Sequence, residues 1–226
     1  VSSDSIIPSS CALWRQKPPT SADGGKLFAA TNVDMKIEPA TLNGKHVVLE
    51  PMLLEHVDEL AAVGLDPKIW EIMVDQISDI NGMRRFVESA LSDQVTGTAL
   101  PFVTRDLASD KIVGSTRFGN IDATNRKVEI GWTWLAPAWQ RSVVNTEAKL
   151  QMLTHAFEVW RCIRVEFKTD ALNQRSRAAI RRLGAKEEGI LRQHMITDTG
   201  RFRDSVYFSI LDNEWPQIKP ELQRKL

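Results

Sequence analysis

Residues 131–149 read GWTWLAPAWQRSVVNTEAK, and the interpretation of the whole chain depends on them. The stretch has the pattern of a strand end, a short loop and the start of a helix. A helix N-terminus presents unpaired N–H groups and a partial positive charge, so it favours a phosphate. Loops that bring their backbone close to a phosphate usually contain glycine, whereas this loop has Val143, Val144 and Asn145. The residues leave two interpretations open: a phosphate site with Asn145 as N-cap, or a capped turn with solvated polar residues.

The segments on either side alternate between strand and helix patterns. Strands are predicted at 46–50, 101–105, 112–118, 127–135, 163–168, 188–196 and 203–211. Helices are predicted at 55–64, 66–75, 82–91, 146–160 and 176–183, followed by a short tail at 215–226. This order predicts an α+β fold with a mixed, largely antiparallel sheet and helices packed on it.

Composition limits the possible functions. The 226 residues include 29 Lys+Arg and 29 Asp+Glu, so the balanced charge disfavours nucleic acid and acidic membranes as partners. The two cysteines, Cys11 and Cys162, fit neither a disulfide framework nor a zinc site. The four histidines share no metal-ligand spacing, so no metal is expected. No apolar run is long enough to cross a bilayer, and we therefore expect a cytoplasmic protein.

Residues 1–34 differ from the rest of the chain. They are rich in Ser, Pro, Gly and Thr and show no periodicity, and they lack the pattern of a secretory signal. We therefore expect a flexible N-terminal extension at 1–34, either native or derived from an expression vector, and one folded domain at 35–226.

A set of motifs around the quoted stretch points to a known family. After the loop come NTEA (145–148), N-x-x-S at Asn173–Ser176 and LGAKEEG (183–189), set among strands and helices in a fixed order. This order resembles the GNAT superfamily of acyl-CoA-dependent N-acetyltransferases, and it looks closest to the branch that acetylates ribosomal-protein N-termini. The resemblance runs from about Leu42 to Trp215. It implies a GNAT fold with helices on both faces of the sheet, a splayed central strand pair and acetyl-CoA as co-substrate.

The resemblance also implies which residues hold coenzyme A. The family's loop pattern, [Q/R]-x-x-G-x-[G/A], wraps the pyrophosphate, and here it corresponds to Gln140, Arg141, Ser142, Val143, Val144 and Asn145, followed by Thr146. Backbone groups of Trp134, Leu135 and Ala136 would pair with the pantetheine arm, and Asn173 and Ser176 match further cofactor positions. Val143 departs from the family glycine because a β-branched residue disfavours positive φ and fills space. Val143→Gly is therefore expected to tighten acetyl-CoA binding.

Glu129 and Ser176 are the catalytic candidates. Glu129 matches the glutamate that acts as general base in the histone-acetylating branch, although a strand carboxylate paired with Arg126 or Arg141 explains it equally well. The family's usual acid is a tyrosine four residues before the helix glycine, but that position is Ile180 here, so Ser176 is the possible substitute. Tyr207, the only tyrosine, is expected to be structural.

The acceptor side is less well defined by the sequence. In this fold the first helices and the last hairpin form the acceptor groove. Trp70 and Met73 are candidates for its apolar wall, although core packing explains both equally well. A protein N-terminal α-amine is the preferred acceptor. A small amine, such as an aminoglycoside-like compound or a polyamine, is the alternative, and a non-catalytic acyl-CoA sensor is a third reading. Monomer and homodimer are both compatible with the family.

Overall fold

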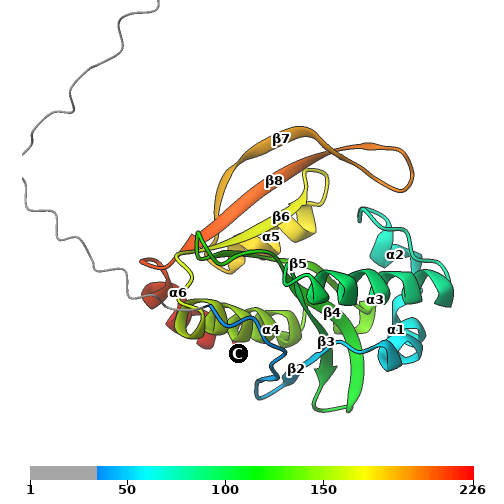
Figure 1. Ribbon diagram of the computed structural model, residues 1–226, viewed down its shortest axis with the longest axis horizontal. Helices are drawn as coiled ribbons and strands as arrows, with labels where there is room; N and C mark the ends of the chain where they lie inside the picture. Colours follow the sequence, from blue (N-terminus) through cyan, green and yellow to red (C-terminus); the bar gives the residue numbers. More distant parts are fainter. Residues whose placement is uncertain (1–34) are drawn as a thin grey trace, which may run out of the picture. The chain divides into compact units, whose positions relative to one another are not determined.

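A computed structural model describes residues 35–226 of the protein (Figure 1). The predicted N-terminal extension at 1–34 lies outside the described residues. Met35, where the patterned sequence begins, is buried in the main core with 6% of its surface exposed. The division of the chain after residue 34 stays a prediction.

One eight-stranded sheet organises the fold, in the order β1-β2-β3-β4-β5-β6-β8-β7. The strands are β1 (Leu42–Asn43), β2 (Val47–Pro51), β3 (Leu100–Asp106), β4 (Lys111–Asp122), β5 (Lys127–Leu135), β6 (Arg164–Asp170), β7 (Lys186–Ile196) and β8 (Phe202–Leu211). Neighbouring strands run antiparallel except β5 and β6, which are parallel. The predicted α+β class with a mixed, mostly antiparallel sheet is confirmed.

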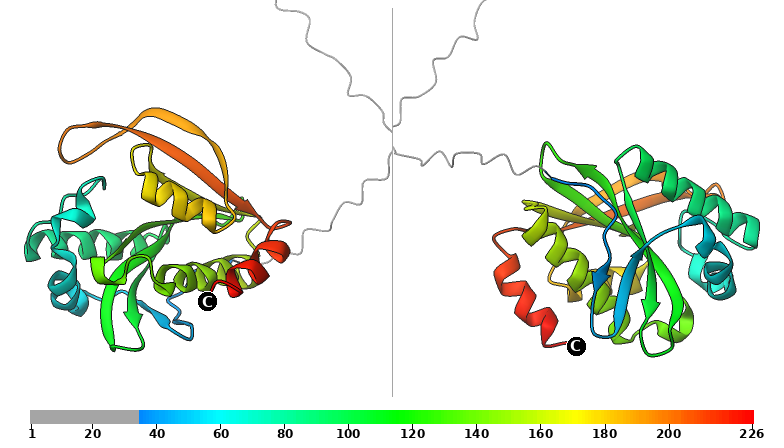
Figure 2. Two further views of the ribbon diagram at one scale, coloured as in Figure 1. Left: turned by 180° about the vertical axis from the view of Figure 1, so that it is seen from behind. Right: turned by 60° about the horizontal axis from the view of Figure 1, so that its bottom comes forward.

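Helices cover both faces of this sheet (Figure 2). They are α1 (Val57–Gly64), α2 (Pro67–Trp70), α3 (Ile80–Val95), α4 (Val143–Thr154), α5 (Gln174–Arg182) and α6 (Trp215–Gln223). Polar N-cap side chains mark where several helices begin. At the start of α3, for example, the Asp79 side chain accepts a hydrogen bond from Gly82 N. Gly184, at φ 95°, follows the end of α5 in the left-handed conformation that glycine adopts without strain.

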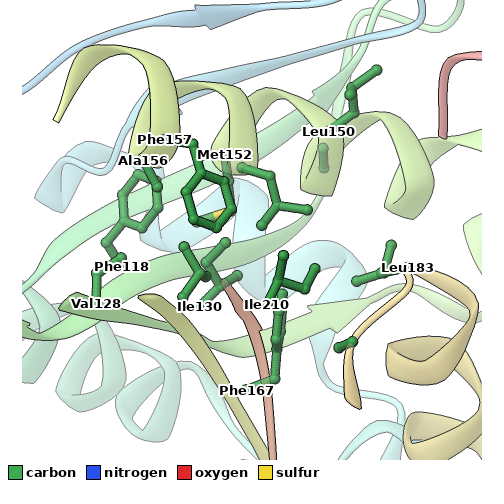
Figure 3. Close-up of a cluster of buried hydrophobic side chains, with 14 of the residues drawn as sticks. Phe118, Val128, Ile130, Leu150, Met152, Ala156, Phe157, Phe167, Leu183 and Ile210 are labelled. Carbon is green, nitrogen blue, oxygen red and sulfur yellow. The ribbon is translucent and has the colours of Figure 1, made fainter. Parts of the chain in front are cut away.

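Two apolar clusters lie on opposite faces of the sheet. The larger joins the strands to α4, α5 and α6; in Figure 3 Met152 and Phe157 face Val128 and Ile130. The smaller joins α1, α2 and α3 to the other face and includes Trp134 of β5. Since side chains alternate along a strand, β5 contributes to both clusters and forms the centre of the molecule.

The structure corrects some local predictions. The prediction that Asn145 caps the helix was wrong: α4 begins at Val143, and Ser142 accepts a hydrogen bond from Val144 N. The helix predicted at 66–75 ends at Trp70, whose carbonyl accepts a hydrogen bond from the Gln76 side chain; beyond it Asp198 of the last hairpin hydrogen-bonds the backbone at Val74 and Gln76. The tail at 215–226 contains α6, which packs against α4. Long-range packing, which local patterns do not contain, decides the last two cases.

Within residues 35–226, no helix is both long enough and apolar enough to cross a membrane. The cytoplasmic location and the choice between monomer and homodimer stay predictions.

Candidate functional site

The central feature of the site is a gap that opens between two parallel strands. Strands β5 and β6 pair only from Lys127 with Arg164 to Glu129 with Glu166. Beyond that point β5 stays paired with β4 as far as Leu135, while β6 stays paired with β8 as far as Asp170. The strands therefore part just after Glu129, and one edge of β5 is left without a strand partner in the described chain. Such an edge can pair with an extended ligand.

Strand β5 carries a β-bulge beyond the point where the strands part. Arg117 pairs with Gly131 and Ser115 with Trp134, so two residues of β5 lie opposite one residue of β4. Trp132, inside the bulge, has φ 48°, an uncommon conformation for a bulky residue and one that is concentrated at functional sites. The extra residue reverses the alternation, so that Ile130 contributes to the α4 cluster while Trp134 contributes to the α1–α3 cluster.

Glu129 stands at the point where the strands separate. Only 3% of its surface is exposed. One carboxylate oxygen, Oε2, accepts a hydrogen bond from Asn120 Nδ2 at 2.8 Å and lies 3.4 Å from Lys168 Nζ. The other oxygen, Oε1, has no hydrogen-bond partner in residues 35–226. The partners differ from the arginines suggested by the sequence, because β4 and β6 flank Glu129 in the sheet.

The loop after β5 leads directly into the N-terminus of α4. Gln140 donates a hydrogen bond from Nε2 to Leu135 O at 2.9 Å, which ties the loop to the strand end. Arg141 takes the left-handed conformation, with φ 61°. Val143 is the first residue of α4 and has a negative φ. The backbone objection to Val143 therefore disappears, since the left-handed residue of this loop is Arg141.

The start of α4 is suited to an anion. Its first N–H groups have no partner within the helix, and Ser142 Oγ caps only that of Val144, at 3.3 Å. The helix dipole adds a partial positive charge at the same place. Together with the unpaired edge of β5, these groups form what we call the loop site: the edge of β5 from Ile130 to Leu135 and residues 136–146.

The first turns of α4 contain two buried charged residues, Glu147 and Lys149, whose contacts the sequence did not predict. The carboxylate of Glu147, 1% exposed, accepts hydrogen bonds from the backbone N–H groups of Lys45, His46 and Val47 at 2.7–2.9 Å. Glu147 therefore fixes α4 against the turn before β2. The glutamate of the NTEA motif thus has a structural role, and its position within a family motif was the only sequence signal for it.

Lys149 is buried on the same helix. Its Nζ donates hydrogen bonds to Thr116 Oγ1 at 2.7 Å and Thr133 Oγ1 at 2.6 Å. Burial without a carboxylate partner lowers the pKa of Lys149 to about 7. Thr116 and Thr133 both contact the carbonyl of Gly131, so the amine lies directly beneath the bulge of β5.

Helix α5 presents the two other residues that resemble cofactor positions. Asn173 is its N-cap, and Asn173 Oδ1 accepts a hydrogen bond from Ser176 N at 3.0 Å. The amide nitrogen of Asn173 donates to no acceptor within residues 35–226. Arg177 and Arg181 on this helix are both paired with Glu187. The single carboxylate of Glu187 therefore offsets part of the positive charge of these two arginines.

Trp70 and Met73 belong to the α1–α3 cluster, and neither lines one of the two cavities next to the site. Trp70 is 1% exposed, and its indole Nε1 donates a hydrogen bond to Gly64 O at 2.7 Å. Met73 packs against the same apolar cluster. Of the two explanations offered by the sequence, the contacts agree with core packing.

Two cavities adjoin the site. The first, of about 240 Å³, we call the Arg117 cavity; it is lined by Asp75, Gln76, Ile77, Gly82, Arg85, Phe86, Ser89, Asp93, Arg117, Trp132 and Asp198. The second, of about 400 Å³, we call the Val143 cavity; it is lined by Lys45, His46, Asp106, Leu107, Ala108, Trp139, Ser142, Val143 and Val144. The first lies against the bulge of β5 and the second against the start of α4.

Other candidate groups do not gather into a site. Cys162 is buried, and burial raises the pKa of its thiol to about 12, so it stays an unreactive thiol near neutral pH. Among residues 35–226, His, Cys, Asp and Glu form no cluster that could hold a metal ion.

Comparison with known proteins agrees with this geometry. Residues 46–186 match the family described as acetyltransferase (GNAT) domain. A Bacillus subtilis (strain 168) protein, YdaF, whose name describes a ribosomal N-acetyltransferase, is 35% identical over 109 residues, which are 48% of this chain and 58% of YdaF. The aligned part of the chain thus spans little more than half the length of that relative.

Solved structures show the same fold over more of the chain. A GCN5-related N-acetyltransferase from Brucella melitensis has a TM-score of 0.77 and 32% identity, covering 83% of this chain and 85% of its own. Mycobacterium smegmatis RimJ, solved in complex with CoA-disulfide, has a TM-score of 0.71 and 24% identity, covering 83% of this chain and 95% of its own. At that identity the second likeness concerns the fold alone.

Proposed function

This chain belongs to the GNAT acetyltransferase family and is an acyltransferase, and from that premise we propose that it transfers an acetyl group from acetyl-CoA directly to a primary amine. The preferred acceptor is the α-amine at a protein N-terminus, as the name of the YdaF relative suggests. The observation that carries the proposal is the parting of β5 and β6 immediately after Glu129. It places an unpaired strand edge, a helix N-terminus and a carboxylate around one gap.

The residues of the loop site fit coenzyme A. We propose that the backbone of Trp134, Leu135 and Ala136 binds the pantetheine arm. The loop Gln140, Arg141, Ser142, Val143, Val144 and Asn145, followed by Thr146, would then surround the pyrophosphate with N–H groups and the positive end of α4. Asn173 would donate its free amide N–H to the same arm, and Ser176 lies on the first turn of the same helix. When bound, acetyl-CoA supplies an acyl group already activated as a thioester.

Glu129 is proposed as the proton acceptor. An amine must be uncharged to attack the carbonyl carbon, so a base has to remove its proton. As the new C–N bond forms and the C–S bond breaks, Glu129 Oε1 would take that proton, directly or through a water molecule. The sulfur would leave as the thiolate or receive a proton from Ser176.

Two measurements test the proposal. Calorimetry with coenzyme A and with acetyl-CoA should show binding to the purified chain. A thiol-release assay should then show acetyl-CoA-dependent turnover with N-terminal peptides or with small amines. Absence of binding for both ligands would disprove the proposal, and so would binding without turnover for any amine in a broad panel.

A further inference from the structure

The Arg117 cavity is assembled from three separate parts of the chain. Its walls come from the segment 75–93, from β4 and β5, and from the tip of the β7–β8 hairpin. The hairpin tip is fixed to the first wall, because Asp198 N donates to Val74 O at 3.1 Å and Asp198 Oδ2 accepts from Gln76 N at 3.0 Å. Figure 1 shows the hairpin extending over the sheet toward α2. These two hydrogen bonds therefore hold the hairpin wall of the cavity against the wall formed by segment 75–93.

Arg117 is the unusual group in this cavity. It is 3% exposed, and its guanidinium carbon lies 5.2 Å from the ring centre of Phe86 and 4.8 Å from that of Trp132. Nη1 donates to Asp93 at 3.3 Å, whereas Nε and Nη2 make no hydrogen bond with residues 35–226. Burial lowers the pKa of Arg117 to about 10, so the group remains a cation at neutral pH. A buried cation held between two rings, with free donors, indicates an oxygen ligand.

Besides Asp93, which is paired with Arg117, two carboxylates face the same space. Asp75 and Asp198 both line the cavity, and burial followed by the nearby Asp198 charge raises the pKa of Asp75. A cation entering the cavity would relieve that unfavourable pairing of charges. Arg85, which also lines the cavity, opposes the entry of a ligand that carries several positive charges.

The cavity also adjoins the proposed point of transfer. Trp132 forms part of its wall, and Lys168, which pairs with Glu129, lies 5.9 Å from the centre of the Trp132 ring. At about 240 Å³ the cavity is smaller than the roughly 300–1,000 Å³ of pockets that enclose drug-sized ligands. It can therefore receive the end of an acceptor rather than a whole large one.

On these grounds we propose that Arg117 determines acceptor specificity by donating a hydrogen bond to the carbonyl oxygen next to the reactive amine, so that the cavity selects α-amino carbonyl compounds such as peptide N-termini. The acidic pair, Asp75 and Asp198, attracts the ammonium form as it approaches. A polyamine satisfies the carboxylates but offers no acceptor to Nε and Nη2 of Arg117. This inference rests on the proposed acetyl transfer and makes its acceptor specific.

The first test compares two acceptors of the unchanged protein. Alaninamide and 2-aminopropane share an amine on a secondary carbon, but only alaninamide has the neighbouring carbonyl. With rates expressed per concentration of uncharged amine, kcat/KM should favour alaninamide by about 10- to 100-fold, the usual range for a hydrogen bond to a charged group. Equal values, or a preference for spermidine over a short peptide, would overturn the inference.

The second test uses variants of the cavity. Arg117→Met should lower kcat/KM for alaninamide and for a short peptide about 10- to 100-fold, and should change it far less for 2-aminopropane. Arg117→Lys, which retains the charge but lacks the forked donors, gives the same comparison if the Met variant fails to fold. An equal loss for every acceptor would indicate a structural role only.

A matched pair of surface variants completes the design. Arg85→Gln should improve the relative rate with spermidine, whereas Arg84→Gln, its exposed neighbour outside the cavity lining, should not. Calorimetry with acetyl-CoA separates the two proposals. If acetyl-CoA binds and amines are acetylated without regard to the carbonyl, this inference fails alone; if acetyl-CoA does not bind, the proposed function fails with it.

Discussion

On one side of the parting strands, the loop site takes nearly all of its groups from the continuous segment 130–146. On the other side, the Arg117 cavity joins segments as distant as Gln76 and Asp198, which are 122 residues apart. The loop site uses mainly backbone groups, which any sequence with the right local conformation can supply. The cavity uses side chains whose chemistry is particular to this chain. A shared co-substrate would need the first kind of site, and a particular acceptor would need the second.

Glu129 lies between the two regions, so its substitution should have the largest effect. Glu129→Gln keeps the shape and the contact with Asn120 but cannot accept a proton. Turnover should fall about 100- to 10,000-fold, the usual contribution of a general base. The acidic limb of the pH–rate profile should disappear, while the calorimetric Kd for acetyl-CoA should stay the same. A pH–rate profile like that of the wild type would assign the base to another group or to water.

Glu147 tests how far the loop site depends on its support. Glu147→Ala leaves the N–H groups of Lys45, His46 and Val47 without partners and also opens a cavity. An unsatisfied buried donor, as at Val47, costs about 1–3 kcal/mol, while the part-buried donors of Lys45 and His46 can regain water in part. Together with the cavity, this should lower the free energy of unfolding by about 3 kcal/mol. Urea denaturation measures this loss. Asp58→Ala, at an exposed carboxylate on α1, is the control and should change stability by less than about 0.5 kcal/mol.

The contrast between the two regions also explains what the sequence could predict. The strand, loop and helix order of 127–149 was visible because each element is specified by its own residues. Gln140 lies in the loop, whereas Val143 is the first residue of α4 and Ser142, not Asn145, is the N-cap. Arg117 gave no signal, because an arginine in a strand looks like an exposed residue until Phe86 is known to pack against it. Pairings between distant segments depend on tertiary structure, which local periodicity does not record.

Lys149 predicts an effect of pH on stability. Its pKa is about 7 in the folded protein against the ordinary value of 10.5, so between these pH values the unfolded chain binds more protons than the folded one. Stability should therefore rise as the pH increases from about 7 to about 10, by on the order of 3 kcal/mol. Lys149→Met removes the titrating group and should flatten this part of the curve while raising stability at pH 7. Urea denaturation of both proteins from pH 6 to pH 10 measures it, and parallel curves would contradict it.

Gly119→Ala tests whether the Arg117 cavity can be disturbed without affecting the loop site. A Cβ at this position would lie 2.3 Å from the Trp132 ring, so Gly119→Ala must displace that ring from Arg117. Overpacking should cost about 1–3 kcal/mol of stability. The KM for a peptide acceptor should rise, whereas the Kd for acetyl-CoA should change little, because the loop site binds through the backbone of β5 and the variant displaces only the Trp132 side chain. A matching loss of acetyl-CoA affinity would show that the two regions are coupled through the bulge of β5.

Substitution of Val143 should give the smallest effect on acetyl-CoA binding. It separates the two objections to a valine in the loop site, namely backbone strain and crowding. Because Val143 has a negative φ at the start of α4, glycine offers it no release of backbone strain. Only crowding by its methyl groups is left, and alanine relieves that as well as glycine does. We therefore expect Val143→Ala and Val143→Gly to tighten acetyl-CoA binding equally and by less than about tenfold, with the glycine variant about 0.5–1 kcal/mol less stable. Calorimetry and urea denaturation measure both quantities. A gain in affinity for glycine but not for alanine would mean that a ligand requires a backbone conformation at residue 143 other than the helical one.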